Sequence, residues 1–242
     1  MPHLPSSAIP MRNTLLLLLA CAGGAVDAVS YMELGRVFTA NMTGNTVLLG
    51  LAIVQADSHA IIRSALALAG FLMGGAVGAW IVERGQPGSV WPTTVTVALV
   101  LEWAVLVVFA IGWQYTSGAS SPRSAGDALI VLSAFAMGVQ SAAARRLDVS
   151  GIATTYITGT LTSLVARLMS WASHIAMRGS PAQSLPPARG TGLLAAVWLV
   201  YFGGAIVAGA VTILDRVLAV VFPTAIVLIV IVTAAARVRT RG

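Results

Sequence analysis

The chain has 242 residues, of which 57% are hydrophobic and only 9% are charged, and its mean hydropathy is +0.89. Soluble domains carry about 25% charged residues, so this composition excludes an ordinary water-soluble globule. The net charge is +6 and all 14 basic residues are Arg, but they lie between or beside apolar blocks, which indicates membrane topology and lipid headgroup contacts rather than nucleic-acid binding.

Eight apolar segments follow one another along the chain and predict an all-α, polytopic transmembrane helical bundle. About 20 residues of helix span a bilayer. The segments cover residues 13–34, 37–55, 60–82, 91–113, 128–144, 152–172, 191–214 and 217–236. Polar residues crowd the first half of the second segment, and its apolar remainder is too short to span. We therefore expect six to eight membrane segments, with the second and sixth short or broken.

The chain also contains an internal repeat. Gly24-Ala-Val-Asp-Ala-Val-Ser30 matches Gly138-Val-Gln-Ser-Ala-Ala-Ala144, and Thr39-Ala-Asn-Met-Thr-Gly-Asn-Thr46 matches Thr154-Thr-Tyr-Ile-Thr-Gly-Thr-Leu161. A third pair, Phe71-Leu-Met-Gly-Gly-Ala-Val77 and Val200-Tyr-Phe-Gly-Gly-Ala-Ile206, keeps the same order. The predicted organisation is a tail (1–12), a first membrane repeat (13–114), a connector (115–126), a second membrane repeat (127–237) and a basic tail (238–242).

The relative orientation of the two repeats depends on the second and sixth segments. If these segments span, each repeat crosses four times and the repeats are parallel. If they are re-entrant, each repeat crosses three times and the repeats are inverted, an arrangement common in transporters. Under either count more Arg residues fall on the side of the termini, so both termini are expected in the cytoplasm. The Arg distribution does not decide between six and eight crossings.

Asp27 is the most informative single residue, because it lies well inside an apolar segment. A carboxylate at the centre of a membrane helix costs roughly 2.5–3.5 kcal/mol on insertion scales. One interpretation is a proton- or cation-binding site, or a partner for a buried Arg. The other is a hydrogen-bonded structural Asp.

The polar stretch from Thr39 to Thr46 is the second candidate. Irregular backbone at membrane depth must be buried in protein or line a cavity. The side chains that could form a polar pocket near the midplane are Asn41, Thr43 and Asn45, with Thr155, Thr158 and Thr160 opposite by repeat symmetry. The alternative is N-capping of short helices by Asn and Thr. The two interpretations are compatible, since free N–H groups at a helix start also bind anions.

Further polar and charged residues lie inside or at the ends of the apolar segments. Ser141, in the repeat position of Asp27, and its neighbour Gln140 are expected to join the polar pocket. Glu102 could be a partner for an Arg or take part in transport. Arg145 and Arg146 are expected to reach lipid headgroups, with an anion site as the alternative.

Small residues at helical spacing predict tight helix packing. They are Gly70, Gly74, Gly78, Gly203, Gly204 and Gly209. The histidines are scattered, Cys21 is the single cysteine, and no catalytic or nucleotide-binding motif is present. We therefore expect no metal, no cofactor and no enzymatic activity.

Two of these motifs carry a family resemblance. Val26-Asp-Ala-Val-Ser-Tyr-Met-Glu-Leu-Gly35 followed by Val37-Phe-Thr-Ala-Asn-Met-Thr-Gly-Asn-Thr-Val47 resembles the bacterial YoaK family of inner-membrane proteins. Gly138-Val-Gln-Ser-Ala-Ala-Ala-Arg-Arg-Leu147 and Thr158-Gly-Thr-Leu-Thr162 do so too, and the likeness covers residues 14–237. Ser141 departs from the family pattern, which has Asn after Gln. The resemblance implies a bacterial cytoplasmic membrane location and little about activity, because the family is a domain of unknown function.

These observations favour a small-solute transporter or permease with a polar site between its repeats, in which Asp27 binds a proton or cation. The expected partners are the lipid bilayer and a small solute or ion, with an oligomer possible and no nucleic acid. The alternative is a non-transporting structural or interaction protein whose polar groups only satisfy one another. An intramembrane enzyme acting on a lipid would need a nucleophile and base, and no spacing provides them.

Overall fold

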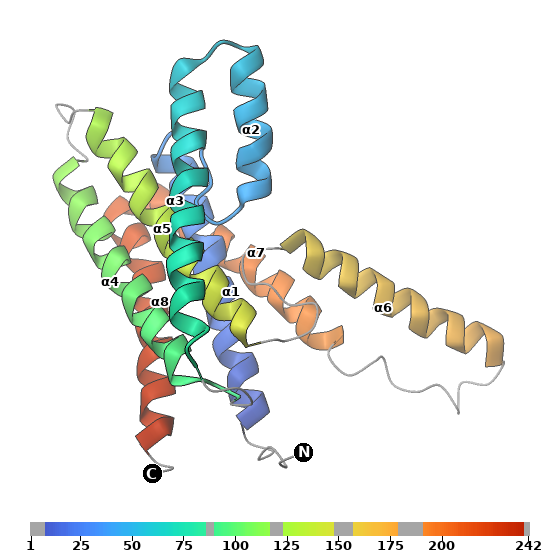
Figure 1. The fold of residues 1–242 in the computed structure, drawn as a ribbon. Helices are drawn as coiled ribbons and strands as arrows, with labels where there is room; N and C mark the ends of the chain where they lie inside the picture. Colours follow the sequence, from blue (N-terminus) through green and yellow to red (C-terminus); the bar gives the residue numbers. More distant parts are fainter. Residues whose placement is uncertain (1–7, 86–89, 117–122, 148–156, 179–190, 240–242) are drawn as a thin grey trace.

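The computed structural model describes residues 8–85, 90–116, 123–147, 157–178 and 191–239, and these form eight α-helices (Figure 1). The helices are α1 (Ala8–Glu33), α2 (Met42–Val54), α3 (Ser58–Val82), α4 (Thr93–Thr116), α5 (Arg123–Arg146), α6 (Ile157–Arg178), α7 (Thr191–Leu214) and α8 (Arg216–Arg239). Helix α1 begins inside the predicted tail, and α4 and α5 extend into the predicted connector. The all-α fold is confirmed.

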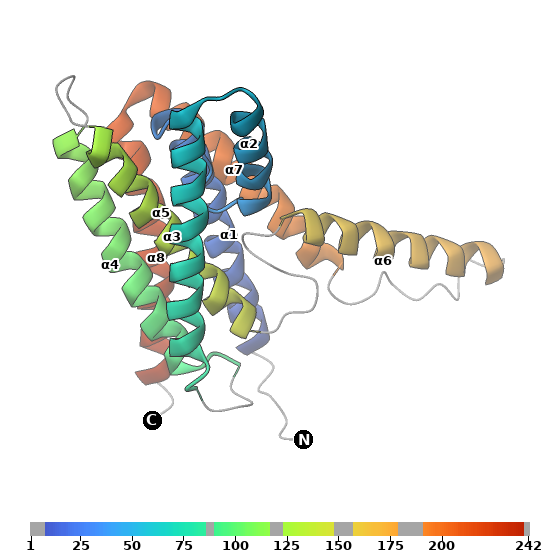
Figure 2. The ribbon, with the colours of Figure 1, turned by 45° about the horizontal axis from the view of Figure 1, so that its top comes forward.

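Six of these helices are long and apolar enough to cross a membrane, namely α1, α3, α4, α5, α7 and α8. Helix α2 has 13 residues and is too short, as expected. Helix α6 is longer than expected, with 22 continuous residues. It stays outside the set of candidate spans because polar and basic residues, gathered on one face of the helix, lower its mean hydropathy. Figures 1 and 2 show α6 extending away from the bundle beyond α7.

The direction of each long helix follows from its contacts. Helices α3 and α5 run parallel, because three glycines of α3 meet three residues of α5 in the same order: Gly70 with Val131, Gly74 with Phe135 and Gly78 with Val139. Helices α1 and α5 are antiparallel, since Gln140 late in α5 donates a hydrogen bond to the carbonyl of Leu19 early in α1. Helix α4 is antiparallel to α5, because Gly112 meets Leu129 while Val95 packs in one cluster with Leu147.

The second repeat is therefore inverted relative to the first. Helix α8 runs against α1: Arg216 at its start pairs with Glu33 at the end of α1 (3.4 Å), and Ala234 packs near Leu16. Helix α7 ends beside Arg216 and so runs with α1. Each long helix of the first repeat points opposite to its counterpart, in the pairs α1 and α5, α3 and α7, α4 and α8. The contacts of α3 with α5 and of α1 with α7 are two copies of one interface.

Helix α2 is re-entrant. After α1 the chain turns at Gly35 and Arg36, both with positive φ (83° and 62°), and then returns into the bundle, where Val37, Thr39 and Ala40 are buried. Helix α2 begins at that depth and runs back alongside α3 to the end from which the chain entered (Figure 2). The turn to α3 carries Asp57, whose pKa is lowered by the hydrogen bond from the Ala60 amide.

This topology predicts which loops share a side of the membrane. In a Cys21→Ser background, single cysteines at Arg36 and Gln55, both exposed, are expected to react with a membrane-impermeant maleimide from the same side. A cysteine at Arg84, at the other end of α3, should react only from the opposite side. Labelling of the Arg36 and Gln55 positions from opposite sides would show instead that α2 spans the bilayer.

Candidate functional site

Asp27, in the second half of α1, is only 4% exposed and is surrounded by hydrogen-bond donors. Its Oδ1 accepts hydrogen bonds from three successive backbone amides, those of Thr39 (3.0 Å), Ala40 (2.7 Å) and Asn41 (3.2 Å). Its Oδ2 accepts a hydrogen bond from the hydroxyl of Tyr201 on α7. A carboxylate with four donors at the positive end of a helix dipole is well stabilised. Asp27 therefore fastens the start of the re-entrant helix to α1 and α7.

The two asparagines of the polar stretch serve the same turn. Asn41 is the N-cap of α2, and its Oδ1 accepts a hydrogen bond from the Gly44 amide (3.1 Å). Asn45 is fully buried; its side chain accepts a hydrogen bond from the Phe38 amide (2.9 Å) and donates one to the Phe38 carbonyl. The hydroxyl of Thr39 lies 2.9 Å from that of Ser133 on α5. The capping interpretation thus describes Asn41, and both carboxamides have local backbone partners.

The predicted polar pocket of Asn and Thr side chains is not formed by the described part of the chain. Thr43 and Thr158 are both exposed on the outer faces of their helices. Thr160, which is in α6, is buried. Thr155 lies outside the described residues. The physical reason is that α2 becomes regular directly after Asn41, so that Thr43 turns away from the face that Asn45 buries.

Gln140 and Ser141 are adjacent on α5 but have different surroundings. Gln140 is fully buried, and its Nε2 donates a hydrogen bond to the Leu19 carbonyl (3.1 Å). Ser141 is partly exposed and lines an open groove between α3 and α5. In the repeat alignment Ser141 is the counterpart of Asp27, and Leu72 in the groove wall is the counterpart of Tyr201. The groove is therefore the second copy of the Asp27 region, without the carboxylate and the phenol.

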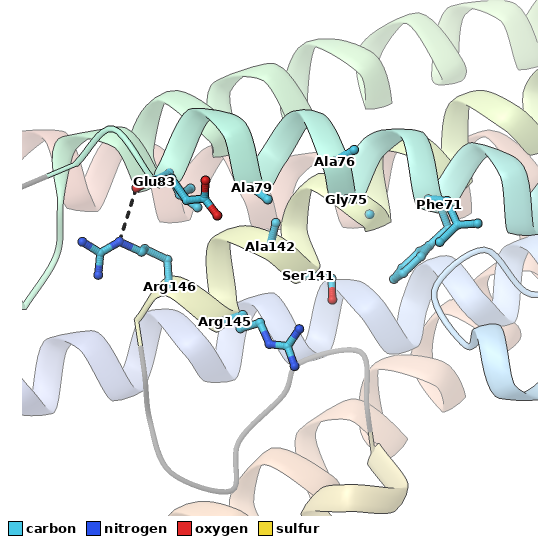
Figure 3. Close-up of a pocket in the computed structure, with 12 residues that line it drawn as sticks. Phe71, Gly75, Ala76, Ala79, Glu83, Ser141, Ala142, Arg145 and Arg146 are labelled. Atoms are coloured by element: carbon cyan, nitrogen blue, oxygen red, sulfur yellow. Dashed lines mark hydrogen bonds between the residues drawn. The ribbon is translucent and has the colours of Figure 1, made fainter.

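This groove has a volume of about 480 Å³. Figure 3 shows Gly75, Ala76, Ala79 and Ala142 along it, with charged side chains at one end. Its lining consists of Phe71, Leu72, Gly75, Ala76, Ala79, Val82, Glu83, Gly138, Ser141, Ala142, Arg145 and Arg146. The small side chains leave room for a ligand between a helix of the first repeat and a helix of the second.

The two arginines at the end of α5 diverge (Figure 3). Arg146 donates hydrogen bonds to the carbonyls of Val82 (3.3 Å) and Gly85 (3.4 Å), and so ties α5 to the end of α3. Arg145 is exposed, and none of the described residues accepts a hydrogen bond from it. Arg145 therefore presents an exposed cation at the margin of the groove.

Glycines bring the helices of the two repeats into backbone contact. Gly70, Gly74 and Gly78 do so between α3 and α5, while Gly204 lies against the backbone of Cys21 on α1. Gly209 makes no such backbone contact: a Cβ added there would lie 3.8 Å from the Sδ of Met32, which is an ordinary van der Waals distance. The packing role predicted for Gly203 is wrong: an added side chain would meet nothing within 4 Å, because one helical step turns this residue away from the face that buries Gly204.

Two residues of the site were not foreseen, Tyr201 and Ser133. Tyr201 is in the third repeat match, at the position that corresponds to Leu72. A hydroxyl at only one of two matching apolar positions could have indicated a hydrogen-bond donor in the bundle. Ser133 is an ordinary small residue in an apolar helix, and nothing in its sequence context distinguishes it.

The fold and the site define a multi-pass membrane protein built from two inverted repeats, with a re-entrant helix anchored on a buried carboxylate. A family model described as a protein of unknown function (DUF1275) matches residues 15–233, so the chain belongs to that family. It is 43% identical, over 159 residues, to the UPF0700 transmembrane protein YoaK of Bacillus subtilis (strain 168), which covers 66% of this chain and 68% of that protein. The predicted YoaK resemblance is confirmed. No solved structure matches the chain.

Proposed function

We propose that the protein is a transporter of a small organic solute and that the groove between α3 and α5 is its binding site. The observation that carries this proposal is the position of the groove, at a contact between two inverted repeats and at the repeat counterpart of the Asp27 region. Inverted-repeat transporters bind their substrates at the repeat interface.

The duplicated interface places the groove at a defined point of the fold. Between α1 and α7, the returning chain packs beside the contact, with Val37 near Ala208 and Ala40 buried. The groove lies at the matching contact of α3 with α5. A site at the contact of two inverted repeats is the place where transporters whose repeats rock against each other bind their substrates.

The chemistry of the groove defines the class of solute. Its walls are mainly apolar, Ser141 is one of the lining residues, and Glu83, Arg145 and Arg146 place charges of both signs at its margin. A small solute with an apolar body and a charged group complementary to Arg145 or Glu83 fits these walls. We propose that this activity is transport and not catalysis. Its partners are the lipid bilayer and the solute, and the chain acts as a monomer or as an oligomer.

Transport is tested by reconstituting the purified protein in liposomes with a panel of labelled amino acids, carboxylates, phosphates and sugars. Arg145→Gln is expected to reduce uptake of an anionic or zwitterionic substrate about tenfold, which corresponds to about 1.4 kcal/mol of lost binding. Ala76→Leu should reduce it by filling the groove. Arg84→Gln, an exposed cation at the same end of the molecule but outside the groove, is the matched control and should transport as the wild type does.

Absence of flux for every solute, or equal flux in the Arg145 and Arg84 variants, would overturn this proposal. The alternative is then a structural or interaction protein, and the fully partnered Asp27 and Asn45 favour it. It predicts variants of Asp27 that unfold more readily and show no separate functional defect.

We further propose that the protein lies in the bacterial cytoplasmic membrane with both termini in the cytoplasm. The start of α1 and the end of α8 lie at the same end of the bundle (Figure 1), and positive charge is retained on the cytoplasmic side. Among the described residues outside α6, that end has Arg12, Arg84, Arg145, Arg146, Arg237 and Arg239, whereas the other end has Arg36, Arg63, Arg123 and Arg216. A reporter enzyme that is active only outside the cytoplasm should show no activity when it is fused to the C-terminus.

A further inference from the structure

Glu102 is a buried acid that the solute site does not use. It lies in the middle of α4, is 0% exposed, and neither of its carboxylate oxygens has a hydrogen-bond partner among the described residues. Leu99 and Leu106, one turn to either side on the same helix face, belong to apolar clusters shared with α1, α5 and α8. Glu102 therefore points into the junction of these four helices.

A second orphaned atom occurs in the same layer of the bundle. The side chain of Gln140 is 0% exposed; its Nε2 is bonded to the Leu19 carbonyl, but its Oε1 has no partner within the described ranges. Val139, next to Gln140, shares a cluster with Leu99, and Met137 shares one with Leu106. Gln140 thus lies on α5 at the level of Glu102 on α4.

No described basic side chain neutralises Glu102. Apart from Asp27, the charged residues of the surrounding helices stand toward the helix ends: Arg12 and Glu33 on α1, Arg63, Glu83 and Arg84 on or next to α3, Arg123, Asp127, Arg145 and Arg146 on α5, and Arg216, Arg237 and Arg239 on α8. Within the bundle, α1 presents Cys21 and Asp27, and Asp27 is already bound by four donors, including Tyr201. An ionised Glu102 would be an uncompensated charge in an apolar interior, which costs several kcal/mol.

We propose that Glu102 is a proton-binding site, in which the neutral carboxylic acid donates its proton in a hydrogen bond to Oε1 of Gln140. This arrangement gives a partner to both orphaned side chains, and the bond from Gln140 to Leu19 fixes the acceptor in place. A hard metal cation takes about six to eight oxygen ligands, whereas the orphaned oxygens in this layer number three. The site therefore suits a proton better than a metal ion. Proton binding here stands apart from the groove and does not depend on a transported solute.

The test is infrared spectroscopy of the full-length protein in lipid nanodiscs at neutral pH, in which the spectrum of each variant is subtracted from that of the wild type. The wild type is expected to show a carbonyl stretching band of a protonated carboxyl group. Glu102→Gln, which keeps the shape of the side chain, should lose this band, whereas Glu83→Gln, an exposed acid on α3, should retain it. Gln140→Leu leaves Glu102 in place and removes its acceptor, so the band should persist and move to higher frequency.

Three results would overturn the proposal. A spectrum without a protonated carboxyl band would mean that Glu102 is ionised. A band unchanged by both Glu102→Gln and Gln140→Leu would belong to another acid. Disappearance of the band on addition of Na⁺ at constant pH would show a cation site in place of a proton site. Should Glu102→Gln fail to fold, the frequency shift in Gln140→Leu decides alone.

Discussion

Replacement of Asp27 by Ala is expected to lower the free energy of unfolding by about 3 kcal/mol or more. The change leaves the amides of Thr39, Ala40 and Asn41 and the hydroxyl of Tyr201 without their acceptor. Each buried donor left unsatisfied costs about 1–3 kcal/mol, and part of this cost is recovered when water or a shifted backbone reaches the gap. Thermal and denaturant-induced unfolding in detergent measure the loss.

Two milder variants separate the contributions of the carboxylate. Tyr201→Phe removes a single donor and should cost about 1–1.5 kcal/mol. Asp27→Asn keeps an oxygen for the three amides and loses the charge, so its stability should fall between those of Tyr201→Phe and Asp27→Ala. An Asp27→Ala protein as stable as the wild type would show that the returning chain is held by its apolar residues alone.

A pair of neighbouring glycines on α7 is expected to respond to alanine with opposite signs. At Gly204 an added methyl group would meet the backbone of Cys21, so Gly204→Ala must push α1 and α7 apart. Such overpacking costs about 1–3 kcal/mol. At Gly203 the methyl group meets no neighbour within 4 Å, and alanine in place of glycine stabilises a helix by about 0.5–1 kcal/mol.

The same unfolding measurements test this pair, and each variant is the other's control for helix propensity. Gly204→Ala should unfold at a lower temperature than the wild type, and Gly203→Ala at the same or a higher temperature. Equal shifts of both variants in one direction would refute the close approach of α1 and α7.

The long helices were predictable because each needs only a run of apolar residues. The segment 191–214 was predicted with the bounds that α7 has, and the repeat emerged from short matching strings. The relative orientation of the repeats was not predictable, since the Arg residues favour the same side for either crossing count. It depends on whether α2 turns back, and that depends on contacts between Asp27 and amides more than ten positions later in the chain.

The candidate site was predicted in part, for a similar reason. Asp27 and Asn45 stood out because polar groups are costly in lipid and must have partners. The partners themselves could not be named: Tyr201 comes from the other repeat, 174 positions away. The direction of a side chain on α2 depends on the residue at which the helix begins. Thr43 was therefore placed in a pocket when it lies on the outer face.

The duplicated interface has a consequence for how this sequence can vary. Within one chain, the contact of α1 with α7 and that of α3 with α5 repeat the same geometry, much as a symmetric dimer repeats its contacts across an axis. A dimer must accept every substitution twice, whereas this chain can alter one copy and conserve the other. Asp27 and Ser141 occupy matching positions and differ in this way: Asp27 anchors the returning chain, whereas Ser141 lines the groove.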